Sequence, residues 1–196
     1  MCLEFDTIAH RYKLDGVMIP HISFVLEQTG FIDKTWFKPE HAERGKAVHS
    51  ACQFLIEGDL DWSTVHPEIL PRVKGFEQFL IERKPTLILS EKPLASKEWR
   101  FSGTPDLVLE VPGDRVQWIV DLKSGASGIA AKLQTAAQEI LVKEECGNGI
   151  YKRFVLELPK DGGYKLIPHD ERMDKLMFLN ALAMVHRRLN EGEIKL

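Results

Sequence analysis

Apolar positions recur along the chain at two different periods, and the change of period separates a helical part from a strand-rich part. Between residues 39 and 83 they return at steps of three and four, which predicts two amphipathic helices. The first is expected over 39–56. The second is expected to run to Arg83, with Pro67 suited to its first turn.

Beyond residue 85 the period becomes two, and β-branched and apolar residues alternate with polar ones. The pattern predicts three consecutive strands, most simply paired as an antiparallel meander. Their expected ranges are 86–94, 98–111 and 116–122. A Gly/Ser loop at 124–128 then leads to a helix at 129–145, a strand at 151–158, a short strand at 164–168 and a helix at 171–189.

The N-terminal segment has the pattern of a β-hairpin. Residues 10–14 and 17–20 flank Asp15-Gly16, a pair favoured in the two-residue type I′ turn. Ser23 is expected to cap a short helix that ends near Gly30.

The order hairpin, α, α, β, β, β, α, β, α predicts an α/β fold with a mixed central sheet flanked by helices and an N-terminal β-hairpin. The 196 residues are expected to form a single domain. Within it we expect a hairpin and short helix at 1–38, a catalytic core at 39–158 and a helical closure at 159–196.

Composition narrows the function classes only a little. The net charge of −3 is not that of a protein that coats nucleic acid through charge alone. Three widely spaced cysteines are too few for a four-cysteine iron–sulfur or zinc site, and a reducing cytosol suits them best. No apolar run approaches a membrane span, and no secretory signal opens the chain, so we expect a cytoplasmic protein without a membrane partner.

Two carboxylates and an ammonium interrupt the apolar strands. Asp106 follows Gly103-Thr104-Pro105, and fifteen residues later comes Asp121-Leu122-Lys123. Neighbouring strands lie about 5 Å apart, so two such carboxylates can share one hard divalent cation. Asp121 and Lys123 are two residues apart and leave the same face of a strand. Leu122 points into the core, and its backbone carbonyl is a further candidate ligand.

This set suits phosphodiester hydrolysis. A metal on the scissile phosphate lowers the pKa of a water molecule and offsets the charge of the transition state. Lys123 can orient that water, help to deprotonate it, or stabilise the developing negative charge. The bland alternative treats Asp121 and Lys123 as a solvated edge pair and Asp106 as a turn residue, but it does not explain two converging interruptions.

The residues Pro105-Asp106 and Asp121-Leu122-Lys123 resemble the motif of the PD-(D/E)XK nuclease superfamily. Ser124-Gly125 extends the likeness to the RecB-like and phage-type exonuclease branch. The resemblance implies a restriction-endonuclease-like core of order α-β-β-β-α-β and a catalytic set that includes Asp106, Asp121 and Lys123.

Three further positions follow from the resemblance. His49, on the first long helix with Gly45 one turn before it, corresponds to a metal-ligating histidine, against the alternative of a core histidine. Glu91 corresponds to a glutamate near the metal, and a solvated strand residue is the competing interpretation. Gln134 corresponds to the glutamine of a Gln-x-x-x-Tyr pattern that holds the site and contacts DNA. Gln138 stands where the family has tyrosine, which leaves its own role open.

The function implied is a divalent-metal-dependent DNA nuclease, in particular an exonuclease in phage or recombination and repair processing. It would use Mg²⁺ or Mn²⁺, without an iron–sulfur cluster and without a nucleotide, since the chain has no phosphate-binding Gly-x-x-x-x-Gly-Lys motif. The alternatives are a structure-specific endonuclease on the same core and an inactive DNA-binding or assembly protein. Expected partners are DNA with ends, single- or double-stranded, and a homo-oligomer or a recombination protein.

The DNA path is left unassigned by the sequence. Basic residues that contact phosphates look the same in sequence as solvated surface charges, and tryptophans that stack on bases look the same as core residues. The candidates are Lys97, Arg100, Lys132, Lys143, Lys152, Arg153, His186, Arg187, Arg188, Trp36, Trp62 and Trp99.

Overall fold

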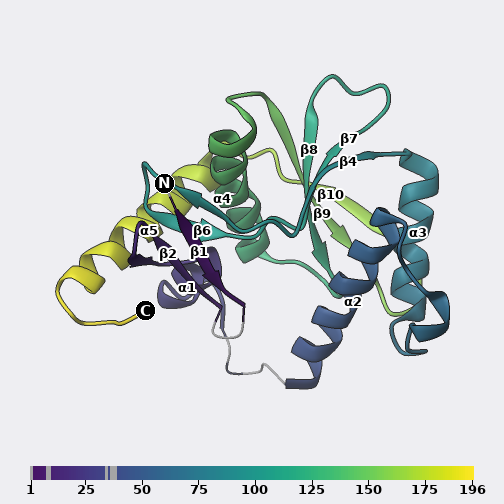
Figure 1. Cartoon of the computed structure of the whole chain (residues 1–196), viewed down its shortest axis with the longest axis horizontal. Coiled ribbons are helices and arrows are strands. Elements are labelled where there is room, and N and C mark those ends of the chain that lie inside the picture. The colour runs from purple at the N-terminus through teal and green to yellow at the C-terminus, as the bar shows by residue number, and fades with distance from the viewer. Residues whose placement is uncertain (1, 8–9, 34, 36–38) are drawn as a thin grey trace.

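The structure is a computed structural model that describes residues 2–7, 10–33, 35 and 39–196 (Figure 1). Its centre is a five-stranded sheet of order β10-β9-β8-β7-β4. The strands are β4 (Thr86–Ser90), β7 (Leu107–Glu110), β8 (Gln117–Lys123), β9 (Tyr151–Glu157) and β10 (Lys165–Pro168). All neighbours pair antiparallel except β8 and β9, which are parallel.

Helices cover both faces of this sheet, because its inner strands alternate apolar side chains toward both sides. Ile119 of β8 packs with α1 (Ile22–Gln28), α4 (Ile129–Cys146) and α5 (Met173–Asn190) in one buried cluster. Trp118, Val120 and Leu122 pack on the other side with α2 (Pro39–Glu57) and α3 (Leu70–Arg83). Figure 1 shows the two helical layers on either side of the sheet. The predicted α/β class with a mixed, helix-flanked sheet is therefore confirmed.

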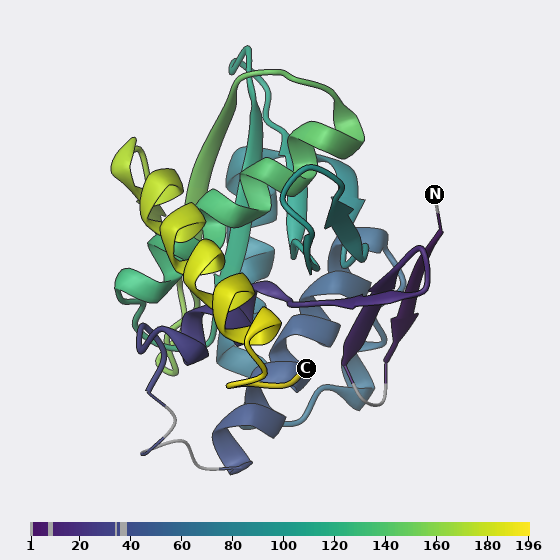
Figure 2. The same ribbon diagram turned by 90° about the vertical axis from the view of Figure 1, so that its left-hand side faces the viewer.

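The N-terminal segment forms a small sheet of its own, seen apart from the central sheet in Figure 2. The predicted hairpin is present as β2 (Arg11–Leu14) and β3 (Val17–Ile19), and positive φ angles at Asp15 (52°) and Gly16 (78°) suit its tight turn. A third strand, β1 (Leu3–Asp6), pairs with β2 and was not predicted, because four residues are too few to show a period.

Two predicted strands are each broken in two by the structure. The expected strand at 86–94 divides into β4 and β5 (Leu94–Ser96), and the one at 98–111 divides into β6 (Phe101–Gly103) and β7. Pro93 and Pro105 stand in the gaps, and proline has no N–H to give to a sheet. The antiparallel meander is thus correct for β4, β7 and β8, but a separate β5–β6 hairpin is inserted in it.

Two helix starts also differ from the prediction. The first helix begins at Ile22 and is capped by His21, whose Nδ1 accepts from the backbone N–H of Phe24, so Ser23 is not the cap. The helix that ends at Arg83, α3, begins at Leu70 with Pro71 in its first turn, so Pro67 lies ahead of this helix. In both places a second residue of suitable type lies nearby, and periodicity does not choose between them. The long helices α2, α4 and α5 otherwise agree with the expected ranges within two residues.

The three segments expected within the domain share its cores. Val25 of the first segment and Phe178 of the last pack with α4 in the same buried cluster. The division at residues 38 and 158 stays a prediction. No helix among the described residues is both long enough and apolar enough to cross a bilayer.

Candidate active site

The pairing of β7 with β8 brings the two predicted aspartates together. Leu107 pairs with Val120, and continuing that antiparallel register by one residue sets Asp106 across from Asp121. Asp106 lies where β7 begins, and its Oδ2 accepts the backbone N–H of Leu122 at 2.6 Å. This bond uses one oxygen of Asp106 to fix the carboxylate and leaves Oδ1 toward the site.

Asp121 and Lys123 leave the same face of β8, as their spacing predicts. Lys123 Nζ lies 2.6 Å from Asp121 Oδ2, and Asp121 is fully buried. The other oxygen, Asp121 Oδ1, accepts from Gln134 Nε2 at 2.7 Å and from Gln138 Nε2 at 3.1 Å. Gln134 Oε1 in turn accepts from Lys123 Nζ at 3.2 Å. The four side chains therefore form one connected polar network between β8 and α4.

His49 reaches the same place from α2, on the opposite side of the sheet. Its Nε2 lies 3.0 Å from the backbone carbonyl of Leu122, and with an N–H there the ring donates to that carbonyl. Its Nδ1 lies 3.6 Å from Asp106 Oδ1 and 3.6 Å from Glu91 Oε1. A histidine held by its far nitrogen against a carbonyl is oriented as a metal-ligating histidine is.

Glu91 reaches the site from a residue with an unusual backbone conformation. It directly follows β4, has a φ of 44°, and donates its N–H to the carbonyl of Asp106 at 3.1 Å. The break in both strands therefore occurs at the point where they carry their carboxylates. Left-handed φ values at a non-glycine residue are uncommon and concentrate at functional sites.

The side chains present fit a divalent cation. His49, Glu91 and Asp106 each offer one ligand atom, and these atoms all lie within 4.8 Å of one another. Asp121 Oδ2 is buried and has no aligned hydrogen-bond donor, only the nearby Lys123 ammonium. A nitrogen with several carboxylate oxygens is a donor set that Mg²⁺ or Mn²⁺ accepts. The Leu122 carbonyl already contacts His49 Nε2. A carbonyl has two lone pairs, so this contact does not exclude a ligand role, which stays a prediction.

The charged groups of the site shift one another's pKa values. Burial raises the pKa of Asp121 and of Glu91 above their ordinary values. Burial would raise the pKa of Asp106, but the charge and hydrogen bond of His49, the Lys123 ammonium and the Leu122 N–H together lower it. Although burial alone would lower the pKa of His49 and Lys123, the surrounding carboxylates raise both. Two cationic side chains thus partly neutralise three crowded acids.

All the candidate residues from the sequence meet in this one region, and their catalytic and ligand roles stay predictions. The residues brought together are His49, Glu91, Asp106, Asp121, Leu122, Lys123 and Gln134. Gln138 is the residue whose part was not assigned from sequence. Its position one helical turn after Gln134 is the signal that points to the shared contact.

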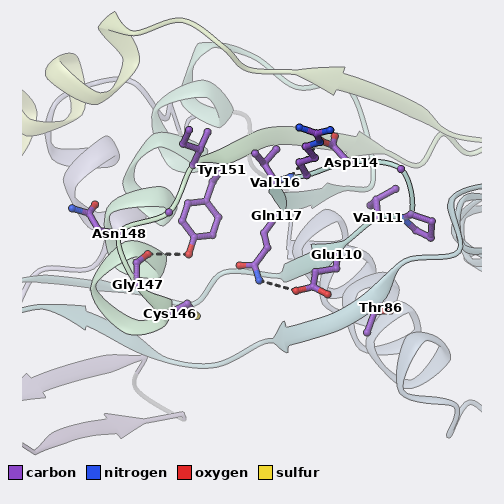
Figure 3. Close-up of a pocket in the computed structure, with 15 residues that line it drawn as sticks. Thr86, Glu110, Val111, Asp114, Val116, Gln117, Cys146, Gly147, Asn148 and Tyr151 are labelled. Atoms are coloured by element: carbon purple, nitrogen blue, oxygen red, sulfur yellow. Dashed lines mark hydrogen bonds between the residues drawn. The ribbon is translucent and has the colours of Figure 1, made fainter.

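A large cavity lies elsewhere in the molecule. It measures about 830 Å³ and is lined by Thr86, Gln117 and Tyr151, which begin their strands, and by Glu110, which ends one (Figure 3). Asp121 and Lys123 lie at the other end of β8. The large cavity therefore opens at the end of the sheet opposite to the acidic cluster formed by Glu91, Asp106 and Asp121.

Several basic DNA-contact candidates are engaged within the protein. Arg153 is buried and lies 3.3 Å from Glu139 and 3.2 Å from Asp174. Lys143 and Lys152 pair with Glu139 and Asp114, each at 2.5 Å. Trp62 packs under Lys74, with Nζ 4.0 Å from the ring centroid, and Trp36 lies outside the described residues. Arg153 in particular forms ion pairs in the protein interior.

Comparison with known proteins gives independent support for the fold alone. No protein-family model matches the chain, and no curated protein matches it. Among solved structures, the crystal structure of a "Putative exonuclease" from Eubacterium rectale aligns with it at a TM-score of 0.51. The alignment covers 92% of this chain and 77% of that one at 13% sequence identity. A likeness at this identity shows that the two chains share a fold.

Proposed function

We propose that the protein is a divalent-metal-dependent DNA nuclease of the PD-(D/E)XK type, and that it degrades DNA from strand ends. The observation that carries the proposal is the convergence of His49, Glu91 and Asp106, with ligand atoms within 4.8 Å, beside the buried Asp121–Lys123 pair. Four separate elements of the fold, α2, β4, β7 and β8, bring these groups to one point.

Each side chain has a task in this scheme. His49, Glu91, Asp106 and Asp121 would hold Mg²⁺ or Mn²⁺, which when bound makes water more acidic and offsets charge on a phosphate. Lys123 is held against Asp121 and Gln134, so its ammonium is kept at the place where negative charge develops during hydrolysis. Gln134 and Gln138 fix Asp121 Oδ1, which would leave Oδ2 as the oxygen that could bind the cation.

Action from strand ends is supported by likeness rather than by the acidic cluster itself. The Eubacterium rectale protein of the same fold carries the name "Putative exonuclease", and the Asp121-Leu122-Lys123-Ser124-Gly125 run resembles the phage-type branch. Phage or recombination and repair processing is the setting that this implies. Further copies of the chain, or a recombination protein, would supply any processivity.

Digestion of linear and covalently closed circular DNA, each with Mg²⁺ or Mn²⁺, tests the proposal. We expect nucleotides to be released from the linear DNA while the closed circle stays intact. Nicking of the circle would instead favour a structure-specific endonuclease. If both forms stayed intact with either metal, the chain would act as a DNA-binding or assembly protein.

A further inference from the structure

A small cavity borders the acidic cluster and has no part in the proposed chemistry. It measures about 180 Å³. Glu91, Asp106, Gln134 and Gln138 form one side of it, and so the cavity is continuous with the candidate metal centre. The other side is built mainly by His10, Tyr12 and His21 of the N-terminal segment and by Thr104.

The N-terminal side of the cavity is lined by aromatic rings. The His10 ring stands edge-on to His21, with centroids 5.0 Å apart, and edge-on to Tyr12 at 5.5 Å. Burial, together with the charge of Lys46, lowers the pKa of His10, so its imidazole is neutral near pH 7. Neutral rings of this kind favour contact with another aromatic ring over contact with a phosphate.

One of the lining residues, Gln138, carries an unused hydrogen-bond acceptor. Gln138 is 1% exposed, and its Nε2 donates to Asp121. The amide cannot be turned around, because its oxygen would then face the carboxylate. Gln138 Oε1 therefore stays buried without a donor among the described residues. Tyr12 and Thr104 share a hydroxyl hydrogen bond of 2.8 Å, which adds a second polar point.

The size of the cavity limits what can enter. A volume of about 180 Å³ holds roughly six water molecules at ~30 Å³ each. Sites for drug-sized ligands usually start at about 300 Å³. One planar ring system fits both the size of the cavity and the aromatic rings and hydroxyl groups of its walls.

We propose that this cavity receives the nucleobase of the terminal nucleotide of a DNA strand. The inference rests on the proposed nuclease function and specifies its substrate. Since Glu91 and Asp106 belong both to the cavity and to the acidic cluster, a base seated here has its neighbouring phosphate at the metal centre. The site then selects a strand end, because a base inside a continuous duplex is stacked and paired.

Cleavage of oligonucleotides that lack the terminal base tests this inference. Single-stranded and duplex DNA, labelled internally, would carry either an intact terminal nucleotide or an abasic one at the 5′ end, the 3′ end or both. With Mn²⁺ we expect the intact end to be released about tenfold faster or more, since one stacked and hydrogen-bonded base contributes at least about that factor. An abasic site placed mid-strand is the matched substrate control and should leave the initial rate unchanged.

Protein variants locate the effect in the cavity. His10→Ala should reduce the preference for an intact end toward one while the abasic end is still cleaved, and Thr104→Val provides a second, smaller change. His41→Ala, at an exposed position of α2, should keep the full preference. Equal release of intact and abasic ends by the parent would overturn the inference and leave the nuclease intact. Absence of cleavage on every substrate would remove the proposed function and the inference with it.

A binding measurement gives a readout besides activity. With Mg²⁺ present, deoxynucleoside monophosphates should shift the imidazole proton resonances of His10, identified by their loss in His10→Ala. The base-free compound 2-deoxyribose 5-phosphate should leave them in place. Equal shifts with both compounds would contradict a base-binding cavity.

Discussion

Gln134 and Gln138, one turn apart on α4, donate to the same carboxylate oxygen, Asp121 Oδ1, at 2.7 and 3.1 Å. Two amides on one oxygen hold the carboxylate rigidly between strand and helix. Oδ2 is left with the Lys123 ammonium as its neighbour and without an aligned donor. The pair therefore acts by positioning Asp121, and Gln138 does so where the resembling family has tyrosine.

Loss of the second amide should weaken catalysis. In Gln138→Ala we expect turnover to fall by about tenfold or more, the range found when supports of metal ligands are removed. The concentration of Mn²⁺ needed for half-maximal rate should rise as well, because Asp121 is less well oriented. Gln78→Ala, at an exposed glutamine of α3, is the matched control. An unchanged rate in Gln138→Ala would contradict the positioning role.

Metal binding should depend on His49. Titration calorimetry with Mn²⁺ on the DNA-free protein should show affinity lowered by about tenfold or more in His49→Asn, since one nitrogen ligand is lost. His41→Asn changes an exposed histidine of the same helix and should bind as the parent does. Equal affinities of the parent and both variants would mean that the ion binds elsewhere.

Gly75 should resist substitution, although alanine is usually preferred in helices. A Cβ built on Gly75 of α3 would lie 2.0 Å from the carbonyl oxygen of Gly163, in the turn between β9 and β10. We expect Gly75→Ala to lower the free energy of unfolding by about 1–3 kcal/mol through overpacking. Gly125→Ala has nothing within 4 Å of its Cβ and should change little in the same urea titration. A stabilised Gly75→Ala would contradict the close packing.

Asp114 should make the stability of the protein depend on acid pH. Hydrogen bonds from Lys152 and from Trp118 Nε1 lower its pKa to about 2. An unfolded aspartate titrates near ~3.9, so the folded state holds its charge more strongly. This contribution is present above about pH 4 and is lost as pH falls toward about 2.

Comparison of the parent with Asp114→Asn measures this contribution. Urea titrations should show the variant less stable at pH 6, with the difference shrinking between about pH 4 and pH 2. A difference that stays constant over that range would show that the charge of Asp114 is not its cause.

The sequence predicts the elements of this fold well where periodicity is long. The α2, α4 and α5 helices and strands β8 and β9 each extend over seven residues or more, enough for a period to show. The prediction fails at Glu91 and Asp106, where β4 ends and β7 begins and the β5–β6 hairpin is inserted between them. Those breaks depend on a positive φ at Glu91 and on prolines whose neighbouring residues pair with other segments of the chain. Both features are set by the tertiary structure, which the periodicity of a sequence does not show.

For the site, the sequence indicates which residues to expect but not how they are arranged. The two-residue spacing of Asp121 and Lys123 is a property of any strand, and their contact follows directly. That His49 binds the carbonyl of Leu122, or that Gln138 shares Asp121 with Gln134, depends on how α2 and α4 pack on opposite faces of the sheet. The cavity beside the site depends on an N-terminal sheet that is distant in sequence.

Asp121 is proposed to belong to a metal-dependent nuclease centre. The most direct test of this claim is digestion of end-labelled linear DNA with Mn²⁺ by the parent, Asp121→Asn and Asp59→Asn, the last at an exposed position, with circular dichroism confirming that each is folded. We expect release of label by the parent and by Asp59→Asn, none on addition of a chelator, and a loss of about 100-fold or more in Asp121→Asn. Equal digestion by the parent and Asp121→Asn would contradict the claim.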